Sequence, residues 1–186
     1  MPGTNAPNKV QFNIKNVHYA KKTDEGYAIP VPIPGAVNLN LSPEGDNTPF
    51  YADGMVYFSS VSNQGYSGDL EIAKVPDQML KDIWGFTEDN SKVLTENATA
   101  EPAEFALLFQ IDGDKDESLY ALYSVTAQRP AIASATNEAS KVPQTQTLAM
   151  TAIPLADGKV SCRTTVDTPE DVKTGWFNSV YTGAAA

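Results

Sequence analysis

Apolar side chains at every second position are the feature that most constrains the fold of this chain. Residues 37–41 alternate apolar with polar side chains, and residues 105–111 do the same. Alternation of this kind is typical of β-strands that are buried on one face. It resumes over residues 119–127 after the acidic turn 112–116, which predicts a long β-hairpin. Further strands are expected at 10–19, 27–33, 55–61, 67–74, 144–153 and 158–165.

Two short segments predict helices that cover these strands. Pro76 opens the first segment and Gly85 closes it, with an apolar face between them. The second segment opens at Thr168-Pro169. Because the strands alternate and are not continuous apolar runs, we expect a mainly β fold with minor α. Its architecture would be two packed antiparallel sheets, as a sandwich or small barrel, flanked by one or two short helices.

The length of 186 residues fits one domain with short extensions. We expect a flexible N-terminal arm over residues 1–9, a β domain over residues 10–181 and a flexible C-terminal tail over residues 182–186. Residues 42–54 are expected to form a long polar loop within the domain. Loops of this length in compact domains are often functional, and this one carries two adjacent aromatic residues.

The acidic residues are concentrated in the middle of the chain. The formal charge of −10 divides into +4 for residues 1–22, −14 for residues 23–120 and 0 for residues 121–186. Affinity for nucleic acids comes largely from Lys and Arg that displace counterions from phosphates. We therefore expect no specific binding of DNA or RNA.

No motif in the sequence predicts a catalytic, cofactor-binding or metal-binding site. Asp112, Asp114 and Asp116 resemble the start of a calcium loop, but the sixth and twelfth positions of that loop are not Gly and Glu. His18 and Cys162 are single residues of their kinds, so they cannot form a zinc site together with further Cys or His. No glycine-rich phosphate loop is present. We predict that the protein is not an enzyme.

No apolar run approaches the ~18 residues that a membrane span needs. The first residues also lack the basic and apolar regions of a signal peptide. We expect the product to stay in the cytoplasm, where a single cysteine is no disadvantage.

A series of segments, in order along the chain, points to a known family. They begin with Lys-Asn-Val-His-Tyr-Ala at 15–20, continue through 30–39, 41–46, 49–53, 65–73, 104–109 and 112–115, and end with Trp-Phe-Asn at 176–178. In order and spacing they resemble the major tail protein (tail tube protein) family of long-tailed phages that infect Gram-positive bacteria. The resemblance spans about residues 10–181.

The resemblance implies a β fold of the phage tail-tube type and subunits that form hexameric rings. Such rings stack into a hollow tube through which phage DNA passes into the host. The implied partners are copies of the chain itself, the tape measure protein, and the tail terminator and tip proteins. The implied location is the virion tail, assembled in the host cytoplasm. The family carries no catalytic residues.

Two sets of residues follow as hypotheses from this reading. For the loop 42–54 we expect contact between rings, with Pro49, Phe50 and Tyr51 as anchors. An acidic lumen would repel the passing DNA duplex over about 8 Å at physiological salt. The acids considered for this lumen are Asp69, Glu71, Glu104, Asp112, Asp114 and Asp116.

Other functions stay open at the level of the sequence. A related tail component, such as a terminator or a secretion-type tube subunit, would share the fold. A host-binding or carbohydrate-binding β-sandwich would also account for the strands and the aromatic residues. An enzyme would have to depend on His18 or Cys162.

Overall fold

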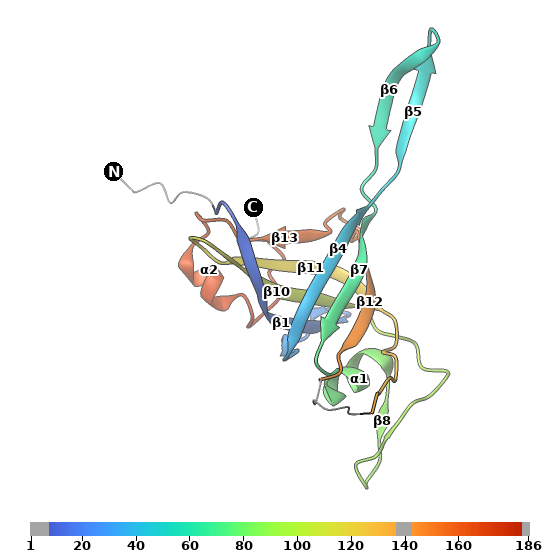
Figure 1. Ribbon diagram of the computed structural model, residues 1–186, viewed down its shortest axis with the longest axis vertical. Coiled ribbons are helices and arrows are strands. Elements are labelled where there is room, and N and C mark those ends of the chain that lie inside the picture. The colour runs from blue at the N-terminus through green and yellow to red at the C-terminus, as the bar shows by residue number, and fades with distance from the viewer. Residues whose placement is uncertain (1–7, 137–142, 184–186) are drawn as a thin grey trace.

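The computed structural model describes residues 8–136 and 143–183 of the chain, and these are mainly β (Figure 1). The strands are β1 (Gln11–Thr23), β2 (Gly26–Tyr27), β3 (Val31–Pro32), β4 (Ala36–Glu44), β5 (Asn47–Ala52), β6 (Met55–Val61), β7 (Gly65–Ile72), β8 (Thr87–Glu88), β9 (Leu94–Thr95), β10 (Phe105–Gly113), β11 (Ser118–Ala127), β12 (Gln146–Ile153) and β13 (Ser161–Arg163). The helices are α1 (Asp77–Trp84) and α2 (Glu170–Gly175). None of the described helices is long and apolar enough to span a membrane.

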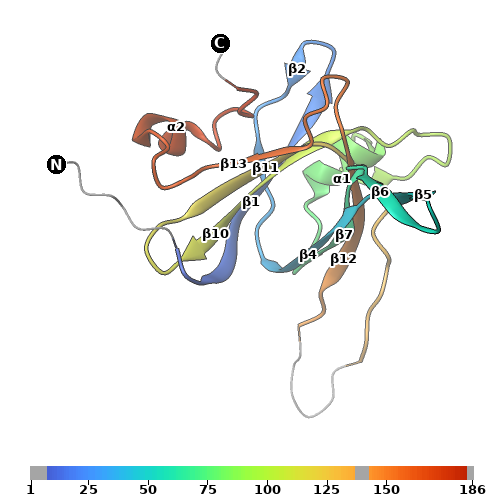
Figure 2. The same cartoon turned by 90° about the horizontal axis from the view of Figure 1, so that it is seen from above.

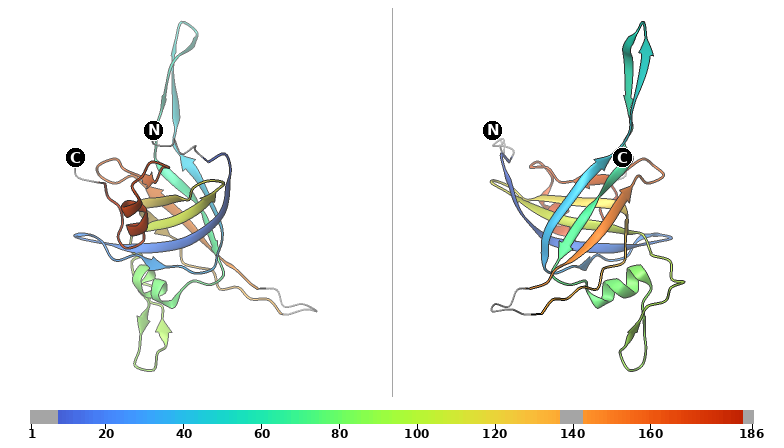
Figure 3. Two further views of the ribbon diagram at one scale, coloured as in Figure 1. Left: turned by 90° about the vertical axis from the view of Figure 1, so that its left-hand side faces the viewer. Right: turned by 45° about the vertical axis from the view of Figure 1, so that its right-hand side comes forward.

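Nine of the strands form one antiparallel sheet. Its order is β2-β1-β10-β11-β12-β7-β4, with β13 also paired to β11 and β3 to β1. The sheet curls, so that β4, β7 and β12 cross in front of β1, β10 and β11 as a second layer (Figure 3). It does not close into a barrel. The mainly β class, with packed layers and two short flanking helices, is confirmed.

The main core lies between the two layers. Phe105, Leu107 and Phe109 of β10 face Leu70 of β7 and Leu148 of β12, and all five are buried. Ile111 packs against the same cluster, so the predicted apolar face of residues 105–111 is confirmed. Burial of each such side chain contributes roughly 1.5–3 kcal/mol, which makes this contact between the layers the main source of stability.

Helix α1 covers one open end of the two layers. Met79, Ile83 and Trp84 are buried, and the Trp84 indole nitrogen donates a hydrogen bond to the carbonyl of Ala127 over 3.1 Å. The helix ends at Gly85, whose φ of 68° places it in the left-handed region that favours glycine. The helix predicted from Pro76 to Gly85 is therefore confirmed.

A second apolar cluster lies on the outer side of β10 and β11, under α2. Ala106 and Leu108 of β10, Leu119 and Ala121 of β11, and Trp176 after α2 are all buried there. Strand β10 is thus buried on both faces, with alternate residues in different clusters.

A register shift in β11 directs the apolar side chains of residues 119–127, which were predicted to share one face, to two different faces of the sheet. Leu107 of β10 pairs with Leu122, whereas Phe105 pairs with Val125, so an additional residue of β11 lies between these two pairs. An additional residue reverses the direction of the side chains that follow it. Leu119 and Ala121 therefore face α2, while Val125 and Ala127 face the main core. The prediction that residues 119–127 share one face was wrong for this reason.

Two segment assignments also change. Residues 27–33 form only the two-residue strands β2 and β3, because the neighbouring prolines remove backbone donors. Residues 42–54, expected as a loop, contain the end of β4 and all of β5. The reason is the Asp53-Gly54 turn, which allows the chain to fold back as a hairpin.

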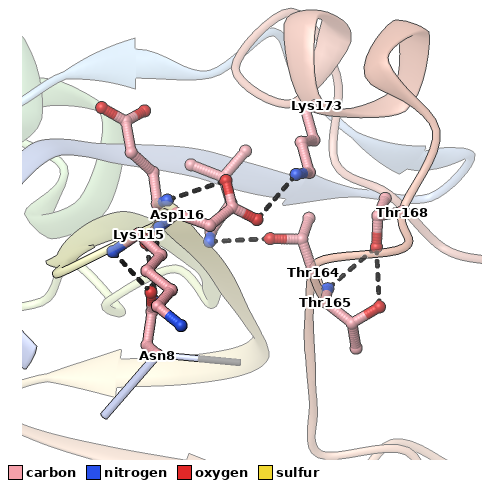
Figure 4. A network of polar contacts seen from close by, with 9 residues as sticks. Asn8, Lys115, Asp116, Thr164, Thr165, Thr168 and Lys173 are labelled. Atoms are coloured by element: carbon pink, nitrogen blue, oxygen red, sulfur yellow. Dashed lines mark hydrogen bonds and ion pairs between the residues drawn. The ribbon is translucent and has the colours of Figure 1, made fainter. Parts of the chain in front are cut away.

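The expected N-terminal arm is only partly described, because residues 1–7 lie outside the described ranges. Asn8 is fixed rather than loose: its side-chain oxygen accepts from the backbone N–H of Lys115 (3.0 Å) and of Asp116 (2.9 Å). Its side-chain nitrogen donates to the carbonyl of Asp116 over 2.7 Å. Asp116 in turn pairs with Lys173 of α2 over 2.8 Å, so one turn ties the start of the chain to α2 (Figure 4).

The expected C-terminal tail begins with a contact, too. The carbonyl of Thr182 accepts a hydrogen bond from the Lys159 ammonium group over 3.4 Å. Residues 184–186 lie outside the described ranges.

A buried hydroxyl joins β1 to α1 and provides a test of this packing. The Tyr19 hydroxyl donates to Asp82 over 2.7 Å, and burial followed by this hydrogen bond raises the pKa of Tyr19. Replacing Tyr19→Phe should lower the free energy of unfolding by about 1.5–3 kcal/mol, because a hydrogen bond to a charged group is lost. Urea denaturation would measure the change. The control is Tyr51→Phe, because Tyr51 is 65% exposed. If both variants unfolded at the same urea concentration, the Tyr19 contact would not stabilise the fold.

Candidate functional site

The most prominent feature outside the core is a two-stranded ribbon formed by β5 and β6. It projects away from the end of the sheet where β4 and β7 meet it (Figure 1). Its tip is a two-residue turn in which Asp53 and Gly54 have φ values of 53° and 75°. Positive φ at both central residues is the mark of a type I′ turn, which matches the twist of a hairpin. We call residues 47–61 the β5–β6 arm.

The β5–β6 arm carries apolar side chains that none of the described residues covers. Among the described residues, seven of the exposed large hydrophobic side chains belong to it, with exposures from 52% for Val56 to 77% for Val61. Phe50 pairs with Phe58 and Tyr51 with Val56, so both faces of the ribbon are apolar. A two-stranded ribbon is marginally stable alone in water, and an exposed apolar patch indicates an interaction surface.

Hydrogen bonds at the base hold the direction of the β5–β6 arm. The N–H of Ser62 donates to the carbonyl oxygen of Asp46 over 2.9 Å. The N–H of Gln64 donates to the carbonyl oxygen of Glu44 over 2.8 Å. These bonds continue the pairing of β4 with β7 into the pairing of β5 with β6. Between them a Cβ on Gly45 would lie 2.0 Å from the carbonyl oxygen of Ser62. Only glycine permits this close approach of the two chains.

A second surface is the outer face of β4, β7 and β12. Helix α2 covers the other half of the sheet, whereas no described helix covers this half (Figures 2 and 3). Its side chains form three cross-strand rows, Asn38-Glu71-Thr147, Asn40-Asp69-Ala149 and Ser42-Ser67-Thr151. We call these nine residues the open face.

The nine residues of the open face include two acids and no basic group, and Arg129 lies next to them, lining a shallow hollow together with Ser67 and Asp69. Strands β4, β7 and β12 include no Lys or Arg, and Asp69 and Glu71 lie side by side on the middle strand. The only hydrogen bond given to either carboxylate by another side chain comes from Thr145, whose hydroxyl donates to Glu71 over 2.6 Å within the described ranges. Neither carboxylate has an ion-pair partner within those ranges. Two of the acids expected for a lumen are therefore brought together on one surface.

The other four acids from that prediction lie elsewhere and have partners. Glu104 accepts from the Lys22 ammonium (2.5 Å) and the Ser124 hydroxyl (2.8 Å), and these bonds lower the pKa of Glu104. The turn between β10 and β11 holds the remaining three. There Asp112 pairs with Lys15 over 2.9 Å, Asp116 pairs with Lys173 over 2.8 Å, and Asp114 accepts from the N–H of Lys9 over 2.8 Å. Glu104, Asp112 and Asp116 are therefore ion-paired within the subunit, while Asp114 accepts a backbone hydrogen bond.

The predicted anchors Pro49, Phe50 and Tyr51 all lie exposed on the β5–β6 arm. The strand predicted at residues 55–61 is confirmed as β6, but its pairing with residues 47–52 and the exposure of its side chains were not predicted. The signal that could have found this hairpin is Asp53-Gly54 between two apolar stretches, which is a strong short-range indication of a hairpin. The side chains of β6 whose exposure was not predicted are Met55, Val56, Tyr57, Phe58 and Val61.

The two residues considered for catalysis lie in separate packed surroundings. His18 stacks on Phe177 with ring centroids 4.6 Å apart, and its Nδ1 lies 2.9 Å from the carbonyl oxygen of Asn16. The Cys162 thiol lies 3.8 Å from the carbonyl oxygen of Tyr181, and burial raises the pKa of Cys162. Within residues 8–136 and 143–183, no group of three or more His, Cys, Asp or Glu is placed to hold a metal ion.

The chain resembles a solved structure, whereas sequence comparisons find no match. No family model matches the chain, and no curated protein matches it. Among solved structures it is similar to the anti-feeding prophage cap, described as the AFP tube terminating cap and determined by cryo-EM. The two share 12% sequence identity, the match covers 89% of this chain and 100% of the other, and the TM-score is 0.41.

The base of the β5–β6 arm can be tested with one substitution. Gly45→Ala should force the two strands apart at the base and weaken the bond between Asp46 and Ser62, because the new Cβ would lie 2.0 Å from the carbonyl oxygen of Ser62. We expect hydrogen exchange of the backbone amides in residues 46–62 to accelerate while the amides of β10 and β11 stay protected. Gly175→Ala is the control, since nothing lies within 4 Å of its added Cβ. Unchanged exchange in Gly45→Ala would show that the base is not rigidly held.

Proposed function

We propose that this chain is a structural subunit of a phage tail that assembles with copies of itself. More specifically, we propose a tail tube protein whose hexameric rings stack into a hollow tube for the passage of DNA. The observation that carries the proposal is the β5–β6 arm, an extended ribbon with apolar side chains on both faces. We propose no catalytic activity and no cofactor.

The energetics of the β5–β6 arm favour a repeated contact over a single one. Burying one large apolar side chain contributes roughly 1.5–3 kcal/mol. Bringing two proteins together costs roughly 4–15 kcal/mol, so a single arm that buries a few such side chains gives weak association. Several arms on one ring would bind the next ring together, which multiplies the contacts after the first has formed. Stacking of rings therefore suits this arm better than pairing of monomers.

The open face suits the inner wall of such a tube. Small polar side chains offer no apolar surface for another protein to cover. Asp69 and Glu71 would repel the phosphates of passing DNA, and the lack of Lys and Arg on these strands removes groups that would hold it. Strand β4 pairs with β7 along one edge, and pairing of its other edge with a neighbouring subunit would close the ring.

The family resemblance supplies the remaining partners of the proposal. These are the tape measure protein and the tail terminator and tip proteins, with the virion tail as location. A terminator would form rings that do not elongate. A host-binding or carbohydrate-binding protein would bind glycan without forming tubes.

Removal of the β5–β6 arm tests the proposal directly. Residues 47–61 can be replaced by Asn-Gly, because Asp46 and Ser62 are already hydrogen-bonded neighbours. We expect a folded subunit that no longer elongates, since its stacking contact is missing. Negative-stain microscopy and sedimentation at high protein concentration would compare it with the wild-type protein. Tubes of normal length from the variant would contradict the role of the arm.

The behaviour of the wild-type protein separates the candidate functions in the same experiment. Long tubes are expected for a tail tube protein, and isolated rings would favour a terminator. Monomers that bind a glycan with saturable affinity would favour the host-binding alternative.

The open face can be tested by charge reversal. Tubes of the double variant Asp69→Lys/Glu71→Lys should bind linear duplex DNA at least about tenfold more tightly at low salt, and this affinity should fall steeply as salt is added. Filter binding over a salt series would measure it. The matched control reverses Asp24 and Glu25, which are exposed in the turn between β1 and β2. Equal DNA binding by both double variants would place the open face outside the lumen.

A further inference from the structure

An apolar groove lies at the end of the molecule opposite the β5–β6 arm. Helix α1 and strand β8 mark this end in Figure 1. Val75, Leu80, Phe86, Pro130 and Ile132 contribute its apolar lining, and its volume is about 530 Å³. Cavities of this size are large enough to bury several side chains of a partner. We call it the α1 groove.

We propose that the α1 groove receives the β5–β6 arm of a second copy of this chain. The inference rests on the proposed function and specifies which surface of one subunit contacts the arm of the next. The contact would join the tip of the arm to the opposite end of a neighbouring subunit.

The arm cannot reach the groove of its own subunit. The hydrogen bonds of Asp46 with Ser62 and of Glu44 with Gln64 fix the arm as an extension of β4 and β7. In the views of Figures 1 and 3 the arm and α1 extend from opposite ends of the sheet. An arm from another molecule meets no such restriction.

The chemistry of the two surfaces is complementary. The arm presents Phe50, Phe58 and other exposed apolar side chains, and the groove presents Ile132, whose side chain is 100% exposed. Contact between them would remove apolar area from water on both sides. None of the described residues covers Ile132 at the groove, so a partner could bury it.

Two basic and two acidic side chains, Lys74, Arg129, Asp77 and Glu96, also line the α1 groove, so it can accept an arm of low charge. Asp53 at the tip is the only charged residue of the arm, and it has no ion-pair partner within the described ranges. Lys74 lies at the groove, where its ammonium is 3.5 Å from Asp77 and both side chains are largely exposed. Exposed pairs of this kind are weak, so Lys74 can turn to Asp53 of an incoming arm at little cost.

The placement of the two surfaces determines the kind of assembly. Each copy has an arm at one end and a groove at the other, so the contact is heterologous and leaves a free arm and a free groove after every addition. Association of this kind continues along the axis and has a direction. A symmetric pair of subunits would instead use the same surface twice.

Two complementary variants test the α1 groove. The arm variant is Phe50→Ser/Phe58→Ser, and the groove variant is Ile132→Asp, whose exposed position should leave the fold intact. Each variant alone should need about tenfold more protein than wild type to elongate, because buried apolar contact is lost or a charge is placed in it. Mixed in equal amounts, the two variants should form a complex of limited size. The groove variant keeps an intact arm and the arm variant keeps an intact groove, so these two intact surfaces can bind each other. Sedimentation velocity would detect this complex, and thermal unfolding would check that each variant is folded.

The control is Val93→Asp, an exposed apolar position that does not line the groove. It should elongate like the wild-type protein. Elongation of Ile132→Asp at wild-type concentration, with the arm variant still defective, would overturn the groove and leave the proposed function standing. Normal elongation by the arm variant would contradict the role of the arm in the proposed function itself. If Ile132→Asp and Val93→Asp impaired elongation equally, the proposed binding of the arm in the α1 groove would be wrong. The loss of elongation would then be a general effect of added charge at this end of the molecule.

Discussion

One antiparallel ladder sets the position of every surface discussed above. Strands β4 and β7 pair along their whole length. The two segments of the polypeptide that follow β4 and precede β7 extend beyond the sheet as β5 and β6. Close approach of the backbones is required along this path. A Cβ on Gly68 would lie 1.8 Å from the carbonyl oxygen of Asn40, and one on Gly45 would lie 2.0 Å from that of Ser62. Because backbone hydrogen bonds join the β4–β7 pair to the base of the arm, the packing of the core also determines where the arm points.

The two halves of the curled sheet differ in what covers them. Strands β10 and β11 of one half are largely buried on both faces, because α2 and Trp176 pack on their outer side. The half formed by β4, β7 and β12 is buried only on its inner side, and its outer residues are small and polar. An acidic surface in contact with water costs little in stability, whereas an apolar one would require cover. The open face is therefore free to line an aqueous passage.

The acids of the chain separate into two groups by the same logic. Those near β1 and the turn between β10 and β11 are paired with lysines and join segments that are distant in sequence, as Asp116 joins Asn8 to Lys173. Those on the open face have no lysine nearby on their own strands. The first group contributes to the fold, and the second group supplies the negative field of a surface. The net charge of −10 does not distinguish these two roles.

Local patterns in the sequence determined the β class, most of the strands, helix α1 and the exposure of Phe50 and Tyr51. Each of these depends on side-chain alternation, a proline or a glycine stop, which act over a few residues. Only the tertiary structure decided which side of β11 faces the core, since an additional residue in the pairing reverses the side chains beyond it. It also decided that Asp69 and Glu71 have no ion-pair partner among the described residues while Glu104 binds Lys22, because the partner of a carboxylate comes from another part of the chain. The opposite placement of arm and α1 groove follows from the curl of the sheet, which no local pattern encodes.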